Sequence, residues 1–154
     1  GGGYPFVSSH LVREVTTELL PRSLIVTPNT KELEALAVDV DPRLLAASND
    51  ERALQLIKAG TKFVLVTGTH SDSKDVENRL YDESGFVDSW SWPRLAGEYH
   101  GSGCTLASSI SGCLANGSSV VGAVFEAQQF TWNSLQSGYR IGGGQLIPNR
   151  NKGK

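Results

Sequence analysis

Two short apolar runs decide the fold class: SLIVTP at residues 23–28 and KFVLVTG at residues 62–68. Each run is rich in β-branched residues and ends at a proline or a glycine, a pattern that is typical of a buried strand. Between them, helical patterns cover residues 31–37 and about 49–59, the latter capped by Asn49 or Asp50. Strand, helix and strand in this order predict a right-handed crossover and a parallel sheet, and therefore an α/β fold.

The rest of the chain adds helices and one hairpin. Residues 11–20 have helical spacing, and residues 78–82 and 85–90 flank a turn and predict an antiparallel hairpin. Two helices close the chain, at 103–115 and from about 119 to 135. The second of these is expected to bury Val121, Val124, Ala127, Phe130 and Leu135. We expect one domain over residues 1–154.

Composition and charge narrow the classes of partner. The formal net charge is −2 and no run of Lys or Arg occurs, which argues against nucleic acid and anionic membrane surfaces. The chain has two cysteines, Cys104 and Cys113, and their spacing is not that of metal ligands. This pattern indicates free thiols and a cytoplasmic protein. The chain begins with Gly1 and contains no Met, so the sequence predicts a fragment.

The most informative motif is HGSGCTL at residues 100–106, which precedes a helix of small residues. Two glycines separated by one residue leave backbone N–H groups that can converge on an anion at a helix N-terminus. Cys104 would lie in the first turn, where it could accept a proton from a substrate hydroxyl. A packing role for the same residues is the alternative. The spacing fits neither a Walker A loop, nor a dinucleotide fingerprint, nor a nucleophile elbow.

A second polar motif follows the first predicted strand. Asn29 and Glu32 come directly after Pro28. They could cap the following helix, or they could lie near a magnesium ion, which keeps several waters and takes few protein carboxylates.

Residues 100–106 resemble the H-G-[T/S]-G-C-T-L motif of hydroxymethylpyrimidine/phosphomethylpyrimidine kinases, members of the ribokinase superfamily. The resemblance implies that Gly101 and Gly103 form an anion hole, that Ser102 contributes its backbone amide, and that Cys104 is the catalytic base.

Two further stretches carry the same resemblance. TPNTKE at 27–32 is similar to the T-P-N-x-x-E motif of the family, which implies that Asn29 and Glu32 lie near Mg²⁺ and phosphate. VLVTGTH at 64–70 is similar to V-L-V-K-G-G-H, which implies nucleotide-side roles for Thr67, Gly68 and His70. Thr67 stands where many relatives have Lys, so a positive contact to phosphate is absent there or comes from elsewhere.

As a whole, the resemblance implies a ribokinase-like (Rossmann-like) three-layer sandwich with a mainly parallel sheet, a small β-hairpin flap and a missing N-terminal portion. It also implies ATP-dependent, Mg²⁺-assisted phosphorylation of 4-amino-5-hydroxymethyl-2-methylpyrimidine and its monophosphate in thiamine biosynthesis. We expect a homo-oligomer that binds this small molecule and ATP. Two alternatives remain: a pyridoxal kinase of the same fold, and a catalytically incompetent fragment that binds nucleotide or assembles with another chain.

Overall fold

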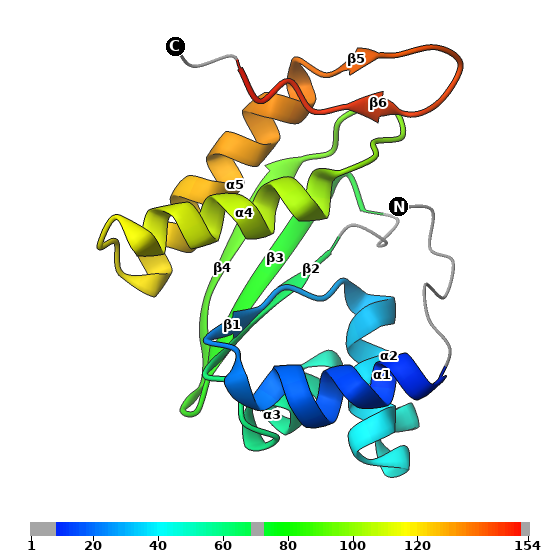
Figure 1. Cartoon of the computed structure of the whole chain (residues 1–154), viewed down its shortest axis with the longest axis vertical. Coiled ribbons are helices and arrows are strands. Elements are labelled where there is room, and N and C mark those ends of the chain that lie inside the picture. Colours follow the sequence, from blue (N-terminus) through cyan, green and yellow to red (C-terminus); the bar gives the residue numbers. More distant parts are fainter. Residues whose placement is uncertain (1–8, 69–72, 152–154) are drawn as a thin grey trace. The chain divides into compact units, whose positions relative to one another are not determined.

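The computed structural model describes residues 9–68 and 73–151. The chain divides into two compact units, one running up to Pro93 and the other beginning at Arg94. The first unit holds a four-stranded sheet with its helices, and the second holds two long helices and a two-stranded ribbon (Figure 1).

The sheet of the first unit has the order β1-β2-β3-β4, with strands at Ile25–Val26, Phe63–Thr67, Asp75–Asp82 and Gly85–Pro93. β1 and β2 are parallel, with Ile25 opposite Phe63 and Val26 opposite Val64. This pairing confirms the parallel crossover predicted from the two apolar runs, and with it the α/β class.

The predicted hairpin is also present, and its strands are the longest in the sheet. β3 pairs antiparallel with both β2 and β4, so the hairpin extends the main sheet. Within the described residues, therefore, the parallel part of the sheet is its β1–β2 end and the other two pairings are antiparallel. A register shift between Leu80 and Tyr81, which pair with Asp88 and Phe86, leaves the extra residue of a bulge on β4. Only two residues separate β3 from β4, a length that permits only an antiparallel connection.

The helical elements of the first unit lie before and between β1 and β2. They are α1 (Ser9–Glu14), the π-helical turn η1 (Val15–Leu19), the 3₁₀ turn η2 (Leu20–Arg22), α2 (Thr30–Val40), the 3₁₀ turn η3 (Pro42–Ala46) and α3 (Asn49–Lys58). α2 and α3 pack against the sheet. Ser48 caps α3, with its hydroxyl accepting from Glu51 N, so the prediction that Asn49 or Asp50 is the cap was wrong by one residue.

Alternation along the strands places one core on the helix-covered face of the sheet. Val64, Val66 and Tyr81 lie on this face and pack with buried residues of η2, α2 and α3: Leu20, Leu33, Ala37, Ala53 and Leu56. Leu65 and Leu80, which pair with each other, belong to the opposite face and are also fully buried.

The second unit contains α4 (Ser102–Ala115), α5 (Val120–Gln136), β5 (Tyr139–Arg140) and β6 (Leu146–Ile147). α4 and α5 pack against each other, and Ser119 caps α5 through Gly122 N. Val124 and Ala127 are buried as predicted, but Val121 and Phe130 are 39% and 38% exposed, so that part of the prediction was wrong. Small and polar residues form the buried stripe instead, because α4 offers a close-packed surface of small side chains. The stripe consists of Ala123, Val124, Ala127, Gln128, Thr131 and Ser134.

Tyr81 ties the sheet to α3 through a polar contact at the edge of the core. Its hydroxyl donates to Asp50 Oδ1 at 2.5 Å, and Arg79 Nη1 lies 3.1 Å from the same oxygen. Burial, and then the hydrogen bond to the Asp50 carboxylate, raise the pKa of Tyr81.

Tyr81→Phe is therefore expected to lower the free energy of unfolding by about 1.5 kcal/mol at neutral pH. In the wild type, the unfolded chain releases the Tyr81 proton near its ordinary pKa of about 10 while the folded protein keeps it, so stability falls as pH rises above that value. Denaturant unfolding between pH 7 and 11 checks this, because Tyr81→Phe should show a shallower decline above pH 10. Parallel declines in the two proteins would contradict it.

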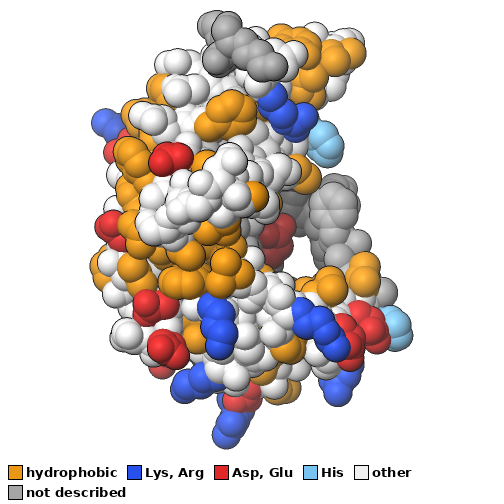
Figure 2. Space-filling model, turned by 60° about the vertical axis from the view of Figure 1, so that its left-hand side comes forward, with side chains coloured by type: hydrophobic (Ala, Val, Ile, Leu, Met, Phe, Trp, Pro, Cys, Tyr) orange, Lys and Arg blue, Asp and Glu red, His pale blue; other side chains and the backbone are white. Residues whose placement is uncertain are grey.

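The surface carries mixed charge. On the face shown in Figure 2, Lys and Arg side chains are interspersed with Asp and Glu. Among the described residues, no helix combines the length and the apolar character that crossing a membrane requires.

Candidate functional site

The structure brings two of the predicted motifs together at the ends of β1 and β2. Asn29 and Thr67 form an isolated parallel bridge, and Thr67 N donates to Pro28 O at 2.9 Å. Asn29 lies just beyond the carboxyl end of β1 and Thr67 is the last residue of β2, and the carboxyl ends of parallel strands are where α/β sheets usually bind ligands. Asn29, Glu32, Thr67 and Gly68 thus all belong to the first unit and to one edge of its sheet.

Asn29 and Glu32 form a capping box at the start of α2. Asn29 Oδ1 accepts from Lys31 N and Glu32 N, both at 3.0 Å, and Glu32 Oε2 accepts from Asn29 N at 3.0 Å. The capping role considered for these residues is therefore confirmed. Glu32 is exposed, and its Oε1 makes no hydrogen bond or ion pair with any described residue, so one carboxylate oxygen is left for another ligand.

Gly68 is required by a close backbone approach. A Cβ at this position would lie 2.2 Å from Glu77 O, and Gly68 N donates to Asn78 Oδ1 at 3.1 Å. Asn78 is itself buried and sits opposite Thr67 in the β2–β3 pairing. Gly68 thus has a packing reason to be glycine beside the proposed nucleotide-side role. His70, assigned the same role from sequence, lies outside the described residues.

The glycine turn lies in the second unit, at the start of α4. Gly101 caps the helix with φ of 87° and ψ of 9°, a left-handed conformation that favours glycine. The first hydrogen bond of the helix runs from Thr105 N to Gly101 O at 3.0 Å. The amides of Ser102, Gly103 and Cys104 precede that bond and are the ones that a helix leaves for an outside acceptor. A Cβ at Gly103 would meet no atom within 4 Å, so this position is open.

The two cysteines of α4 differ in their surroundings. Cys104 is exposed, whereas Cys113 is only partly accessible. Burial, and then a hydrogen bond to Glu126, raise the pKa of the Cys113 thiol. Cys104 is therefore the thiol that a substrate could reach.

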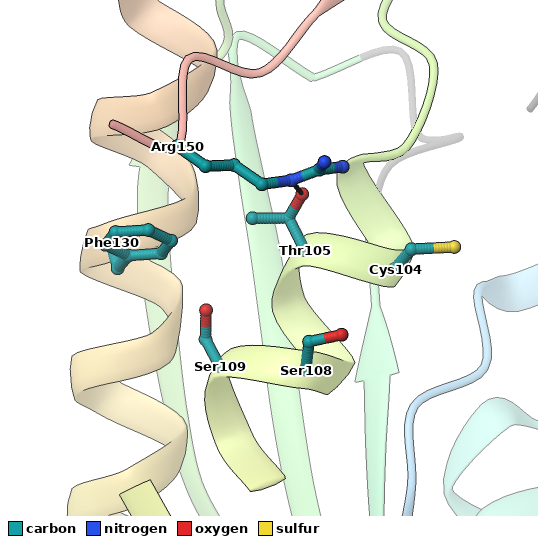
Figure 3. Close-up of a pocket in the computed structure, with 6 residues that line it drawn as sticks. All are labelled: Cys104, Thr105, Ser108, Ser109, Phe130 and Arg150. Atoms are coloured by element: carbon teal, nitrogen blue, oxygen red, sulfur yellow. Dashed lines mark hydrogen bonds between the residues drawn. The ribbon is translucent and has the colours of Figure 1, made fainter. Parts of the chain in front are cut away.

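A hollow of about 380 Å³ lies beside the first turns of α4 (Figure 3). Its lining consists of Cys104, Thr105, Ser108, Ser109, Phe130 and Arg150. In Figure 3, Arg150 reaches across the first turn of α4 to Thr105, while Cys104 points away from Phe130. Sequence reasoning missed Arg150 because 45 positions separate it from Thr105 and no local motif connects the two.

This chain matches the family model described as phosphomethylpyrimidine kinase over residues 1–149. The chain belongs to the phosphomethylpyrimidine kinase family. It is 38% identical over 135 residues to the thiamine biosynthetic bifunctional enzyme TH1 of Arabidopsis thaliana, covering 86% of this chain and 26% of that protein. It is 33% identical over 147 residues to the hydroxymethylpyrimidine/phosphomethylpyrimidine kinase of Streptomyces coelicolor, covering 92% of this chain and 52% of that protein.

Solved structures show the same fold for this member of the phosphomethylpyrimidine kinase family. The pyridoxal kinase of Staphylococcus aureus in complex with AMP-PCP and pyridoxal superposes with a TM-score of 0.83 at 22% identity. The match covers 96% of this chain and 55% of that kinase. The expected ribokinase-like fold is thereby confirmed. The chain spans about half the length of the bacterial kinases that it matches and about a quarter of the plant enzyme.

Proposed function

We propose that the protein phosphorylates 4-amino-5-hydroxymethyl-2-methylpyrimidine and its monophosphate with ATP. The observation that carries the proposal is the glycine turn: in a chain of the phosphomethylpyrimidine kinase family, a left-handed Gly101 precedes three helix-start amides and an exposed Cys104. Phosphoryl transfer needs positioning and stabilisation of charge on the equatorial oxygens, and such a turn supplies both.

In the proposed reaction, the substrate hydroxyl oxygen attacks the γ-phosphorus of ATP and the bond from that phosphorus to the bridging oxygen of ADP breaks. Cys104 Sγ, as a thiolate, accepts the hydroxyl proton. The amides of Ser102, Gly103 and Cys104 donate to the transferring phosphoryl group. ATP use is supported by the S. aureus pyridoxal kinase, whose structure holds the ATP analogue AMP-PCP.

Mg²⁺ is the second proposed cofactor, and the residues at the β1 end fit a limited part in holding it. Among the described residues, no cluster of three His, Cys, Asp or Glu side chains could bind a metal. Glu32 offers one free carboxylate oxygen, and Asn29 fixes that side chain through the capping box. Mg²⁺ in nucleotide sites keeps several waters and takes one or two protein carboxylates, so Glu32 would contact it directly or through water. When bound, the ion would neutralise charge on the phosphates.

Thr67 and Gly68 are proposed to face the nucleotide from the end of β2. Thr67 carries no charge, so its part is limited to hydrogen bonding. We also propose a cytoplasmic homo-oligomer, as the sequence suggested.

The test is product formation by the purified chain. The chain is incubated with MgATP and either hydroxymethylpyrimidine, its monophosphate or pyridoxal, and the phosphorylated products are measured by mass spectrometry. Pyrimidine mono- and diphosphate without pyridoxal phosphate would support the proposed function. Pyridoxal phosphate as the main product would favour the pyridoxal kinase alternative, which the structural neighbour makes worth testing. No product at all would favour a catalytically incompetent fragment.

A further inference from the structure

Thr105 uses one buried hydroxyl to join two segments of the second unit. Its side chain is 3% exposed, and its Oγ1 donates to Gly101 O at 2.7 Å. The same Oγ1 accepts from Arg150 Nε at 2.9 Å. Gly101 O also accepts from Thr105 N, so Thr105 holds the carbonyl of the left-handed glycine by both its backbone and its side chain.

Arg150 closes this arrangement from the other side. A Cβ at Gly101 would lie 3.1 Å from Arg150 Nη2 and 3.9 Å from Pro148 Cδ, so the guanidinium rests directly against the glycine turn. The segment that carries Arg150 is itself fixed, because Asn149 N donates to Ser134 O of α5 at 2.8 Å. Arg150 is therefore held at both ends: its guanidinium by the bond to Thr105, and its backbone by the bond that the preceding residue makes to α5.

The charge of Arg150 is not neutralised by the part of the chain that the structure describes. Arg150 takes part in none of the ion pairs found among the described residues. Nε is used by Thr105, and neither terminal nitrogen bonds to a side chain or carbonyl of the described residues. A guanidinium that touches the glycine turn adds positive charge where the helix amides already favour an anion.

We propose that Arg150 is a positioning residue for the phosphoryl group: it holds Gly101 in place through Thr105 and adds beside the turn a positive charge that no described residue pairs with. The inference rests on the proposed function, since it assumes that the turn binds phosphate. Donors held in place before the reaction need no reorganisation when charge develops, which is why fixing the turn would aid transfer.

Two measurements on the purified chain test the proposal, with Arg150→Ala, Arg150→Lys, Thr105→Val and Thr105→Ser as variants. Thr105→Val keeps the shape of the side chain without the hydroxyl, and Thr105→Ser keeps the hydroxyl. The first measurement is hydrogen exchange of the Thr105 amide by NMR. We expect exchange about fivefold faster in Arg150→Ala and Thr105→Val, the factor that corresponds to one lost hydrogen bond, and near wild type in Thr105→Ser.

The second measurement is protection of Cys104 from iodoacetamide by tripolyphosphate, followed by mass spectrometry of the Cys104 peptide. The concentration that gives half protection should rise about tenfold in Arg150→Ala, the loss expected for one charge-assisted contact, and Arg150→Lys should recover part of it because it restores the charge. A purely structural role would not produce this recovery.

The two measurements separate the inference from the proposed function. Unchanged amide exchange in both Arg150→Ala and Thr105→Val would overturn the positioning role, whatever tripolyphosphate does. Equal half-protection in Arg150→Ala and wild type would overturn the contribution of its charge. If tripolyphosphate leaves wild-type Cys104 unprotected while amide exchange changes as expected, the hold on Gly101 stands and the proposed phosphate site is refuted.

Discussion

Cys104→Ala is expected to lower the rate of pyrimidine phosphate formation by about 10²–10⁴-fold, the range that a general base contributes. The reason is geometric: Cys104 is exposed in the first turn of α4, and its own amide is one of those proposed to hold the transferring group. Without its sulfur, no side chain at this position can accept the hydroxyl proton. Single-turnover assays with mass-spectrometric detection of the product would measure the rate.

Cys113→Ala is the matched control for this prediction. It removes the other thiol of α4, whose pKa is raised by burial and by Glu126, so that this thiol stays neutral. A partly buried, neutral thiol is a poor base. The rate of the Cys113→Ala variant should therefore stay within about twofold of wild type. Cys104→Asp, which restores a base, should recover part of the lost rate. Equal rates in wild type and Cys104→Ala would exclude Cys104 from the proposed role.

Gly68→Ala is expected to lower the free energy of unfolding by about 3 kcal/mol, at the upper end of the cost of overpacking. The added Cβ would lie 2.2 Å from Glu77 O, a backbone atom that the β3 pairings hold in place. Relief would require β2 and β3 to separate at the end of their ladder, with loss of the bond from Gly68 N to Asn78 Oδ1. Denaturant unfolding followed by tryptophan fluorescence measures the change.

Gly112→Ala provides a control of opposite sign. Gly112 lies inside α4, and a Cβ there would meet nothing within 4 Å. Alanine at position 112 should therefore raise the free energy of unfolding by about 0.5–1 kcal/mol, because alanine has a higher helix propensity than glycine. Similar effects of the two substitutions would show that the contact between Gly68 and Glu77 does not constrain the fold.

Local chemistry explains what could be predicted from the sequence. The start of the helix after Asn29 could be predicted because a capping box involves only four consecutive residues. The structure shows both hydrogen bonds of this box. The glycine turn at 101–103 could be placed because only glycine adopts the φ of Gly101 readily. The prediction that Phe130 is buried was wrong because helical spacing identifies only a face of the helix. The packing of α5 on α4 favours small residues over large ones on that face.

The sequence by itself determined the α/β class, the crossover between β1 and β2, the capping box and the turn that carries Cys104. Each of these depends on residues that are near one another in the chain or on a repeating pattern. Only the tertiary structure decided that Asn29 lies beside Thr67, that Gly68 touches Glu77 O, and that Arg150 bonds to Thr105. These contacts join positions 38, 9 and 45 apart in sequence, and backbone packing rather than any local preference brings them together.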